Sequence, residues 1–222
     1  MIKFSKCMLV MALGCAFAGP AQASAVIDAQ NDFIGTYTGA HDAALDVKSS
    51  DVIYNSANHT FEFKATMWGN IAGGLTNPAT TSYIWGINRG QGTAVFAGIG
   101  ITNVLFDSVV VVRPNGSVTI NRIVGGPAAT VLAAGSASIV GASIDLTISE
   151  TELPTLGFAL DDYDWNLWPR DAGGNAHIAD FAPDNAVLNV TVVPEPGSLA
   201  LLATGLLGLL GMKRRAMAAV PG

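Results

Sequence analysis

The densest group of side chains with chemical potential is an acidic stretch at residues 161–166, which reads Asp-Asp-Tyr-Asp-Trp-Asn. In an extended strand, alternate side chains share a face, so Asp162, Asp164 and Asn166 would lie together. Carboxylate and amide oxygens are ligands for hard cations, which makes Ca²⁺ a candidate. The spacing resembles the start of an EF-hand loop, but Leu167 stands where that loop needs glycine. We expect a solvated acidic face and no cofactor, with bound Ca²⁺ as the alternative.

Aromatic side chains offer a second candidate site, because sugars stack on ring faces. Trp168 precedes Pro169 and interrupts the alternation of its segment, which predicts an exposed ring at a strand end and a possible glycan contact. The alternative is that Trp168 is buried, since an aromatic residue in a β-rich domain is more often part of the core.

No catalytic motif stands out. The chain has no Gly-x-Ser-x-Gly elbow, no His-Glu-x-x-His and no phosphate-binding loop. A glycosidase pair drawn from Glu62, Glu150 and Glu152 would need two carboxylates within about 5–10 Å. We therefore expect that the protein is not an enzyme.

The charge balance narrows the class of partner. Residues 24–192 contain 16 acidic and six basic side chains, a net charge near −10. A charge of this sign argues against nucleic acid and other anionic polymers as partners. It is compatible with Ca²⁺ and with a hydrated extracellular matrix.

The elements that would position these residues are strands. Residues 61–67 alternate apolar and polar side chains, the pattern of a half-buried strand. Three hairpins are predicted, pairing 52–54 with 61–67, 109–112 with 117–120 around Asn115-Gly116, and 138–140 with 143–148 around Gly141-Ala142. In a two-residue Asn-Gly turn both positions need φ > 0. Residues 186–193 read as a final strand. The fold class is all-β, an antiparallel β-sandwich of jelly-roll type over residues 24–191.

Two aromatic segments resemble each other. Tyr83-Ile84-Trp85 and Tyr163-Asp164-Trp165 each alternate as a strand requires, with one face in the core. Chance similarity and a duplicated half both remain open.

The N-terminus has the form of a signal peptide over residues 1–23. Lys3 and Lys6 make a positive start, residues 7–18 are apolar, and Ala-Gln-Ala at 21–23 is a small-residue cleavage site. Both cysteines of the chain lie inside this segment. The mature protein would therefore lack disulfides and thiol ligands.

The C-terminal tail begins with Pro194-Glu195-Pro196. Proline fixes φ and lacks the backbone N–H, so strand and helix both end there. The charge-free run 197–212 would span about 24 Å as a helix. This is less than the roughly 30 Å hydrocarbon core, so the transmembrane helix predicted over 198–212 is a marginal anchor.

Lys213, Arg214 and Arg215 follow the apolar run and favour a cytoplasmic C-terminus. The order of Pro-Glu-Pro, short apolar segment and basic cluster resembles the PEP-CTERM sorting signal, over residues 192–217. The resemblance implies recognition by an exosortase, a membrane-embedded transpeptidase-like protease, with transient membrane anchoring and tail removal near Pro-Glu-Pro. It also implies delivery to the cell surface or the exopolysaccharide matrix. The same tail occurs on unrelated central domains, so it implies sorting and no activity.

The leading functional hypothesis is an exported, exosortase-sorted surface or secreted protein, non-enzymatic and associated with the envelope or exopolysaccharide. The alternatives are a carbohydrate-binding module and, third, an exported hydrolase. The expected partners are the exosortase, the membrane and exopolysaccharide.

Overall fold

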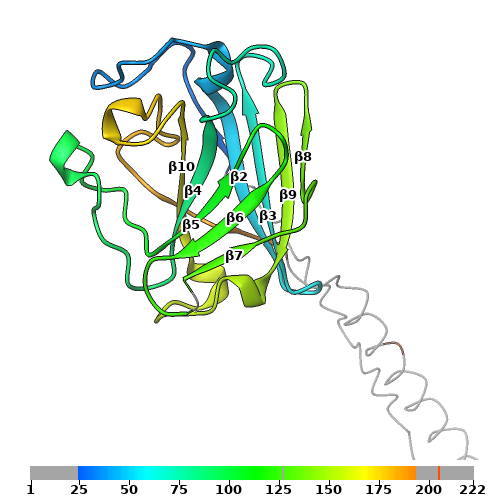
Figure 1. The fold of residues 1–222 in the computed structure, drawn as a ribbon. Helices are drawn as coiled ribbons and strands as arrows, with labels where there is room; N and C mark the ends of the chain where they lie inside the picture. The colour runs from blue at the N-terminus through cyan, green and yellow to red at the C-terminus, as the bar shows by residue number, and fades with distance from the viewer. Residues whose placement is uncertain (1–24, 127, 194–204, 206–222) are drawn as a thin grey trace, which may run out of the picture.

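The computed structural model describes residues 25–126, 128–193 and 205. In this part of the chain, two six-stranded sheets pack face to face (Figure 1). Sheet A has the order β1 (Val26–Ile27), β2 (Val47–Asn55), β3 (Thr60–Met67), β9 (Ser143–Ser149) and β8 (Ala137–Val140), with β12 (Thr191–Val193) also paired to β2. Sheet B has the order β11 (Leu188–Asn189), β10 (Asp164–Arg170), β4 (Ser82–Asn88), β5 (Ser108–Val112), β6 (Val118–Arg122) and β7 (Ala129–Val131).

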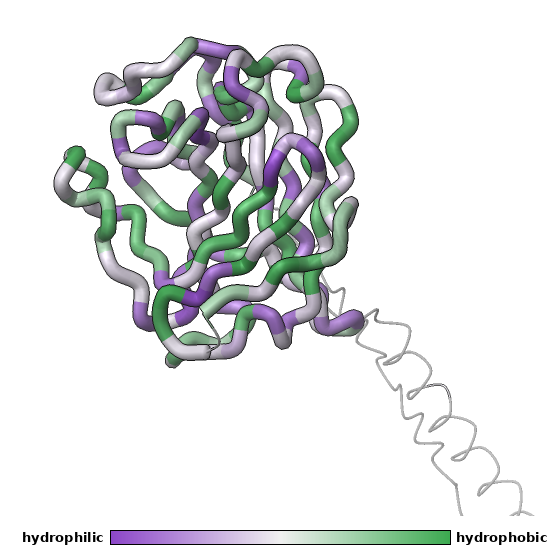
Figure 2. The backbone as a smooth tube through the Cα atoms, in the orientation of Figure 1, coloured by the Kyte–Doolittle hydropathy of each residue, from purple (hydrophilic) through white to green (hydrophobic). Residues whose placement is uncertain are grey.

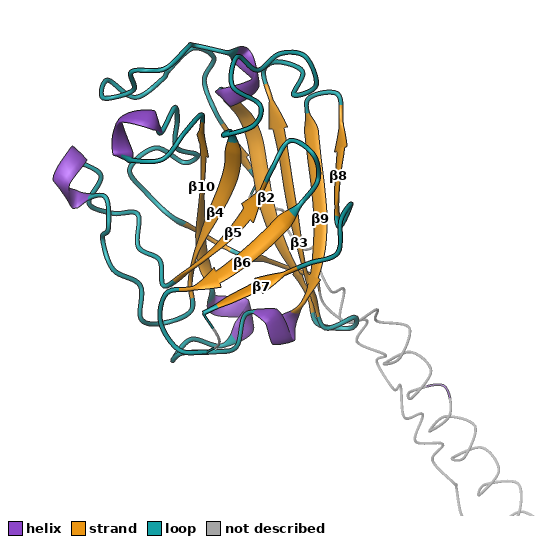
Figure 3. Ribbon diagram, in the orientation of Figure 1, coloured by secondary structure: helices purple, strands orange, loops and turns teal. Residues whose placement is uncertain are grey.

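Helix within the described ranges is confined to short 3₁₀ turns between strands (Figure 3), apart from the helical assignment of the isolated residue Gly205. The turns are η1 (Ala43–Leu45), η2 (Ala97–Ile99), η3 (Glu150–Glu152), η4 (Leu160–Asp162) and η5 (Asn175–His177). Strand pairing is antiparallel except between β12 and β2, which run parallel. The prediction of an all-β protein built from antiparallel sheets is therefore confirmed.

The three predicted hairpins form, as β2–β3, β5–β6 and β8–β9. The turn expected at Asn115-Gly116 differs in type, because only Gly116 has positive φ, at 77°. Its N–H donates to the Arg113 carbonyl at 2.9 Å. Pro114 fixes its own φ in the negative region, so the loop is longer than the two-residue turn predicted.

The prediction of a single final strand over residues 186–193 is wrong. The chain pairs Leu188 with Trp165 in sheet B as β11, and then pairs Thr191 with Ile53 in sheet A as β12. Between them, the Val190 N–H donates to the Tyr163 carbonyl at 2.9 Å. The segment thus crosses from one sheet to the other, which a period-2 pattern does not reveal.

The main core lies between the sheets and is rich in aromatic side chains. The two similar aromatic segments are neighbours, since β4 and β10 pair with Trp85 opposite Leu167. Tyr83, Trp85, Tyr163 and Trp165 are all fully buried in this core, so the prediction of one core face is confirmed. Phe63 from sheet A meets the Trp85 ring edge-on, with 5.7 Å between centroids.

The outer face of sheet B carries a second apolar cluster, which we call the outer cluster. Its buried members are Ile84, Phe96, Val104, Phe106, Trp168, Ile178 and Phe181. The loop that carries η2 contributes to it, and Figure 2 shows apolar residues on that loop as well as in the strands.

Trp168 is buried in the outer cluster, with only 2% of its surface exposed. Of the two interpretations of Trp168, the exposed ring is wrong and the buried ring is confirmed. Its ring lies 5.0 Å from that of Phe96 and 4.9 Å from that of Phe106, between centroids. Residues of the η2 loop, such as Phe96, cover the outer face of β10. The sequence of β10 alone gives no sign of this cover.

The predicted signal peptide, residues 1–23, and the predicted helix 198–212 lie outside the described residues, apart from Gly205. Among the residues that are described, no helix has the length and apolar character needed to cross a membrane.

Gly86 makes room for Trp168, because a Cβ added there would lie 2.5 Å from two ring carbons. We expect Gly86→Ala to lower stability by about 1–3 kcal/mol, the usual cost of overpacking a core. Thermal unfolding followed by tryptophan fluorescence measures this. Gly98→Ala is the matched control, since nothing lies within 4 Å of its added Cβ. Equal melting temperatures for the two variants would contradict the packing described.

Candidate functional site

The predicted acidic face does not form as a unit. Asp162 is exposed in η4, ahead of the strand that starts at Asp164. The Asp164 carboxylate accepts hydrogen bonds from Asn189 Nδ2 at 3.0 Å and Asn88 Nδ2 at 3.3 Å. Partial burial raises the pKa of Asp164.

Asn166 is buried, and its Nδ2 donates to the carbonyls of Pro183 and Ala186. Its amide therefore ties β10 to the segment before β11. Since Asp162 lies in η4 and precedes the strand, the three residues do not share the single strand face predicted from their spacing.

A different group of carboxylates gathers near the start of the domain. One oxygen from each of Asp28, Asp32 and Asp180 lies within 4.8 Å of the others. Burial, followed by repulsion from Asp32 and Asp184, raises the pKa of Asp28 to about 7. Burial likewise raises the pKa of Asp180 to about 8. Local spacing gave no signal for this group, because Asp180 is remote in sequence from the other two.

The glutamates considered for a hydrolase have partners. Glu150 accepts a hydrogen bond from the Tyr54 hydroxyl at 2.8 Å and lies 3.1 Å from His59 Nδ1. Glu152 forms an ion pair with Arg122 at 2.5 Å. These contacts connect strand ends to η3, which gives both carboxylates a structural role.

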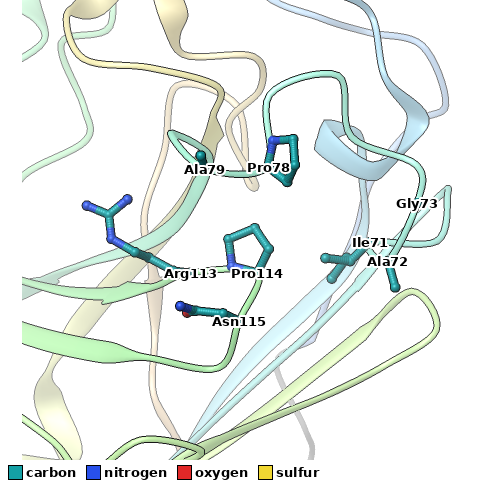
Figure 4. Close-up of a pocket in the computed structure, with 8 residues that line it drawn as sticks. All are labelled: Ile71, Ala72, Gly73, Pro78, Ala79, Arg113, Pro114 and Asn115. Atoms are coloured by element: carbon teal, nitrogen blue, oxygen red, sulfur yellow. The ribbon is translucent and has the colours of Figure 1, made fainter.

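One hollow, of about 410 Å³, lies at an end of the sandwich between two loops (Figure 4). Pro78 comes from the loop before β4, and Pro114 from the turn between β5 and β6. Figure 4 shows the two proline rings facing each other, with Ile71 on the far side. The hollow is shallow, and the residues that line it are largely apolar.

A second hollow, of about 320 Å³, lies over β10, β4, β5 and β6 of sheet B. Its lining residues are Thr80, Ser82, Ile84, Val111, Arg113, Thr119, Asn121, Arg170, Ala172 and Gly173. We call it the polar hollow, because hydroxyl, amide and guanidinium groups surround a small apolar floor. No carboxylate lines it, although the domain is strongly acidic.

Arg170 is held in place at the rim of the polar hollow. Its guanidinium donates to the carbonyls of Ala172 at 2.6 Å and Gly174 at 2.9 Å. Partial burial lowers its pKa, although Asp171 opposes this effect. Arg113, by contrast, is exposed. The two guanidinium groups make this hollow a candidate for oxygen-rich ligands with negative charge.

The end of the folded domain is a paired strand. In β12, Val192 lies opposite Tyr54 and Val193 opposite Asn55. The Thr191 hydroxyl donates to Asp51 Oδ1 at 3.1 Å, which holds the strand against β2. β12 therefore extends two residues past the predicted domain end at 191, to Val193, which directly precedes Pro194.

The family model of the PEP-CTERM protein-sorting motif matches residues 192–215. The prediction of this motif is confirmed, and the match includes Pro194, Glu195 and Pro196 as well as Lys213, Arg214 and Arg215, all of which lie outside the described residues. The motif implies recognition by an exosortase and an exported, envelope-associated protein. No curated protein and no solved structure matches the chain.

The raised pKa values of Asp28 and Asp180 predict how stability depends on pH in the presence of a chelator. Both carboxyls stay protonated in the folded state to about pH 7 and 8, against 3.8 in the unfolded chain. Their contribution to stability is complete below pH 3.8 and is lost as pH rises through the folded values. We expect the melting temperature in EDTA to fall as the pH rises from about 6 to about 9.

The Asp28→Asn variant, which cannot ionise at this position, should lose less stability over that pH range. Asp162→Asn is the control, because Asp162 is exposed and outside the group, and it should follow the wild type. The same pH profile for Asp28→Asn and wild type would contradict the assignment.

Proposed function

We propose that this chain is an exported protein whose tail is processed by an exosortase, and whose β domain serves a non-enzymatic, structural role at the cell surface or in the exopolysaccharide matrix. The observation that carries the proposal is the sorting motif at residues 192–215. The match begins within β12, so the sorting signal is continuous with the end of the folded domain.

The junction explains how processing would leave the domain whole. Strand pairing accounts for residues 191–193, and Pro194 follows immediately. Because proline lacks the N–H that a further ladder bond needs, β12 has a natural end at this point. Cleavage near Pro-Glu-Pro would therefore remove no residue that pairs with β2.

The non-enzymatic role is supported by how the acidic side chains are used. Glu150 and Glu152 are engaged with Tyr54, His59 and Arg122. No carboxylate lines either of the two hollows described above. A buried aromatic core and paired strands suffice for a stable domain that has no catalytic activity.

Deletion of residues 194–222 should abolish exosortase processing and leave export intact. The expected readout in the native host is loss of the mass shift on immunoblots and loss of the normal surface location. Deletion of residues 218–222 is the control, because it leaves the matched motif intact, and it should be processed as wild type. Unchanged processing after the longer deletion would refute the sorting proposal.

A carbohydrate-binding module is the second candidate, and the polar hollow is the observation that favours it. Saccharide hydroxyls can exchange hydrogen bonds with Ser82, Thr119 and Asn121, while Arg113 and Arg170 suit a carboxylate on the sugar. Trp168 is not available for stacking because it is buried. The ligand class is therefore an acidic saccharide held by polar contacts.

Binding of acidic polysaccharides on a glycan array tests this second candidate. Arg113→Ala should weaken binding about tenfold, because a hydrogen bond to a charged group contributes about 1.5–3 kcal/mol. Lys64→Ala is a matched control, since it removes an exposed cation from sheet A, away from the hollow. No binding by the wild type, or equal loss in both variants, would reject the candidate.

A further inference from the structure

Two parts of the chain, far apart in sequence, bring three carboxylates to one place. Asp28 and Asp32 belong to the loop after β1, and Asp180 belongs to the segment between η5 and β11. One oxygen of each lies within 4.8 Å of the others. Two oxygens that share a Ca²⁺ ion at about 2.4 Å lie at most about 4.8 Å apart. The group therefore has the size of a calcium coordination sphere.

A fourth carboxylate supplies an independent observation. Asp46 follows η1 and is completely buried, yet its Oδ1 has no hydrogen-bond partner. Its other oxygen accepts the Asn31 N–H at 2.8 Å, which ties it to the loop of Asp28 and Asp32. Asp46 is also close enough to Asp28 and Asp32 for charge repulsion. A buried carboxylate oxygen without a partner is costly unless a ligand satisfies it.

Two oxygens of the Asp28, Asp32 and Asp180 group are also buried without a hydrogen-bond partner. They are Asp28 Oδ2 and Asp32 Oδ1. Backbone contacts hold the Asp180 carboxylate in position. Its Oδ2 accepts from the Val47 N–H at 2.8 Å, and its Oδ1 accepts from the Phe181 N–H at 2.7 Å. Backbone N–H groups thus orient Asp46 and Asp180, while Asp28 Oδ2, Asp32 Oδ1 and Asp46 Oδ1 remain without a hydrogen-bond partner.

Nothing positive within the described residues balances these charges. No ion pair recorded there includes Asp28, Asp32, Asp46 or Asp180. The nearby charged group that adds to them is Asp184, another carboxylate. Like charges at this separation repel strongly when they are partly buried, so a cation would relieve both the repulsion and the unsatisfied oxygens.

We propose that Asp28, Asp32 and Asp180 form a Ca²⁺ site, beside the buried Asp46, that joins the start of the β domain to its C-terminal segment. The ligands are all oxygens, which hard cations prefer, whereas zinc sites use histidine or cysteine. Partial exposure of Asp28 and Asp32 leaves room for water ligands. Calcium is favoured over magnesium because it accepts more ligands and an irregular geometry.

The proposal goes beyond sorting and does not depend on it. An extracellular module typically binds Ca²⁺ with a Kd of about 0.1–1 mM, so the site would fill outside the cell. Binding would then fasten the loop after β1 to the segment before β11. The ion would cross-link the domain over residues 25–193, a stretch of sequence that contains no cysteine.

Thermal unfolding of the full chain in detergent, first in EDTA and then with CaCl₂, tests the proposal. At Ca²⁺ well above Kd we expect the melting temperature to rise by about 5 °C or more. Equilibrium dialysis with labelled Ca²⁺ should show one bound ion per chain. MgCl₂ at the same concentration should give a smaller rise.

Asp32→Asn is the diagnostic variant, because no recorded hydrogen bond of the described structure depends on its side chain and the fold should survive the change. It should lose most of the Ca²⁺-dependent rise and most of the bound ion. Asp162→Asn, at the acidic stretch singled out by sequence, should keep both. No rise in the wild type, or a rise that Asp32→Asn retains, would overturn the proposal, as would loss of the rise only in Asp162→Asn.

Discussion

The buried ion pair between Arg89 and Asp107 constrains one whole end of the sandwich. Both side chains are fully buried, and Arg89 Nε lies 2.7 Å from Asp107 Oδ1. The guanidinium also donates to the carbonyls of Val124 and Pro154, while the Arg89 carbonyl accepts the Leu156 N–H. The loop before β5, the loop after β6 and the segment between β9 and β10 are thus all held at the end of β4. Loss of either partner would leave an uncompensated buried charge, at a cost of about 3–5 kcal/mol.

This anchoring matters because sheet B is covered on both faces. Its inner face meets sheet A, and the loop that follows Arg89 carries Phe96 and Phe106 back over the outer face. The cover hides Trp168 and leaves the polar hollow as an accessible part of the same face. The arrangement makes the Trp168 ring unavailable for stacking on a sugar, and the accessible hollow is lined by hydroxyl, amide and guanidinium groups.

The two ends of the described domain meet on one strand. β1 pairs with β2 at Ser49 and Ser50, and β12 pairs with β2 at Ile53 to Asn55. The predicted signal peptide precedes β1, and the sorting motif begins within β12. The proposed calcium site lies beside the same strand, since Asp180 accepts from the N–H of Val47, its first residue. A cation there would hold together the region from which both targeting segments depart.

Sequence by itself determined the features whose cause is local. The hairpins follow from alternation and turn residues, which act within a few positions, and the sorting motif is a linear order of residues that needs no fold to be recognised. Tertiary structure decided the rest. Whether Trp168 is exposed depends on loops that pack over it, and the division of residues 186–193 depends on which sheet has a free edge. The meeting of Asp28 and Asp32 with Asp180 depends on the chain reversals between them. Contacts of this kind are set by packing between distant segments, and the spacing of neighbours along the chain carries no record of them.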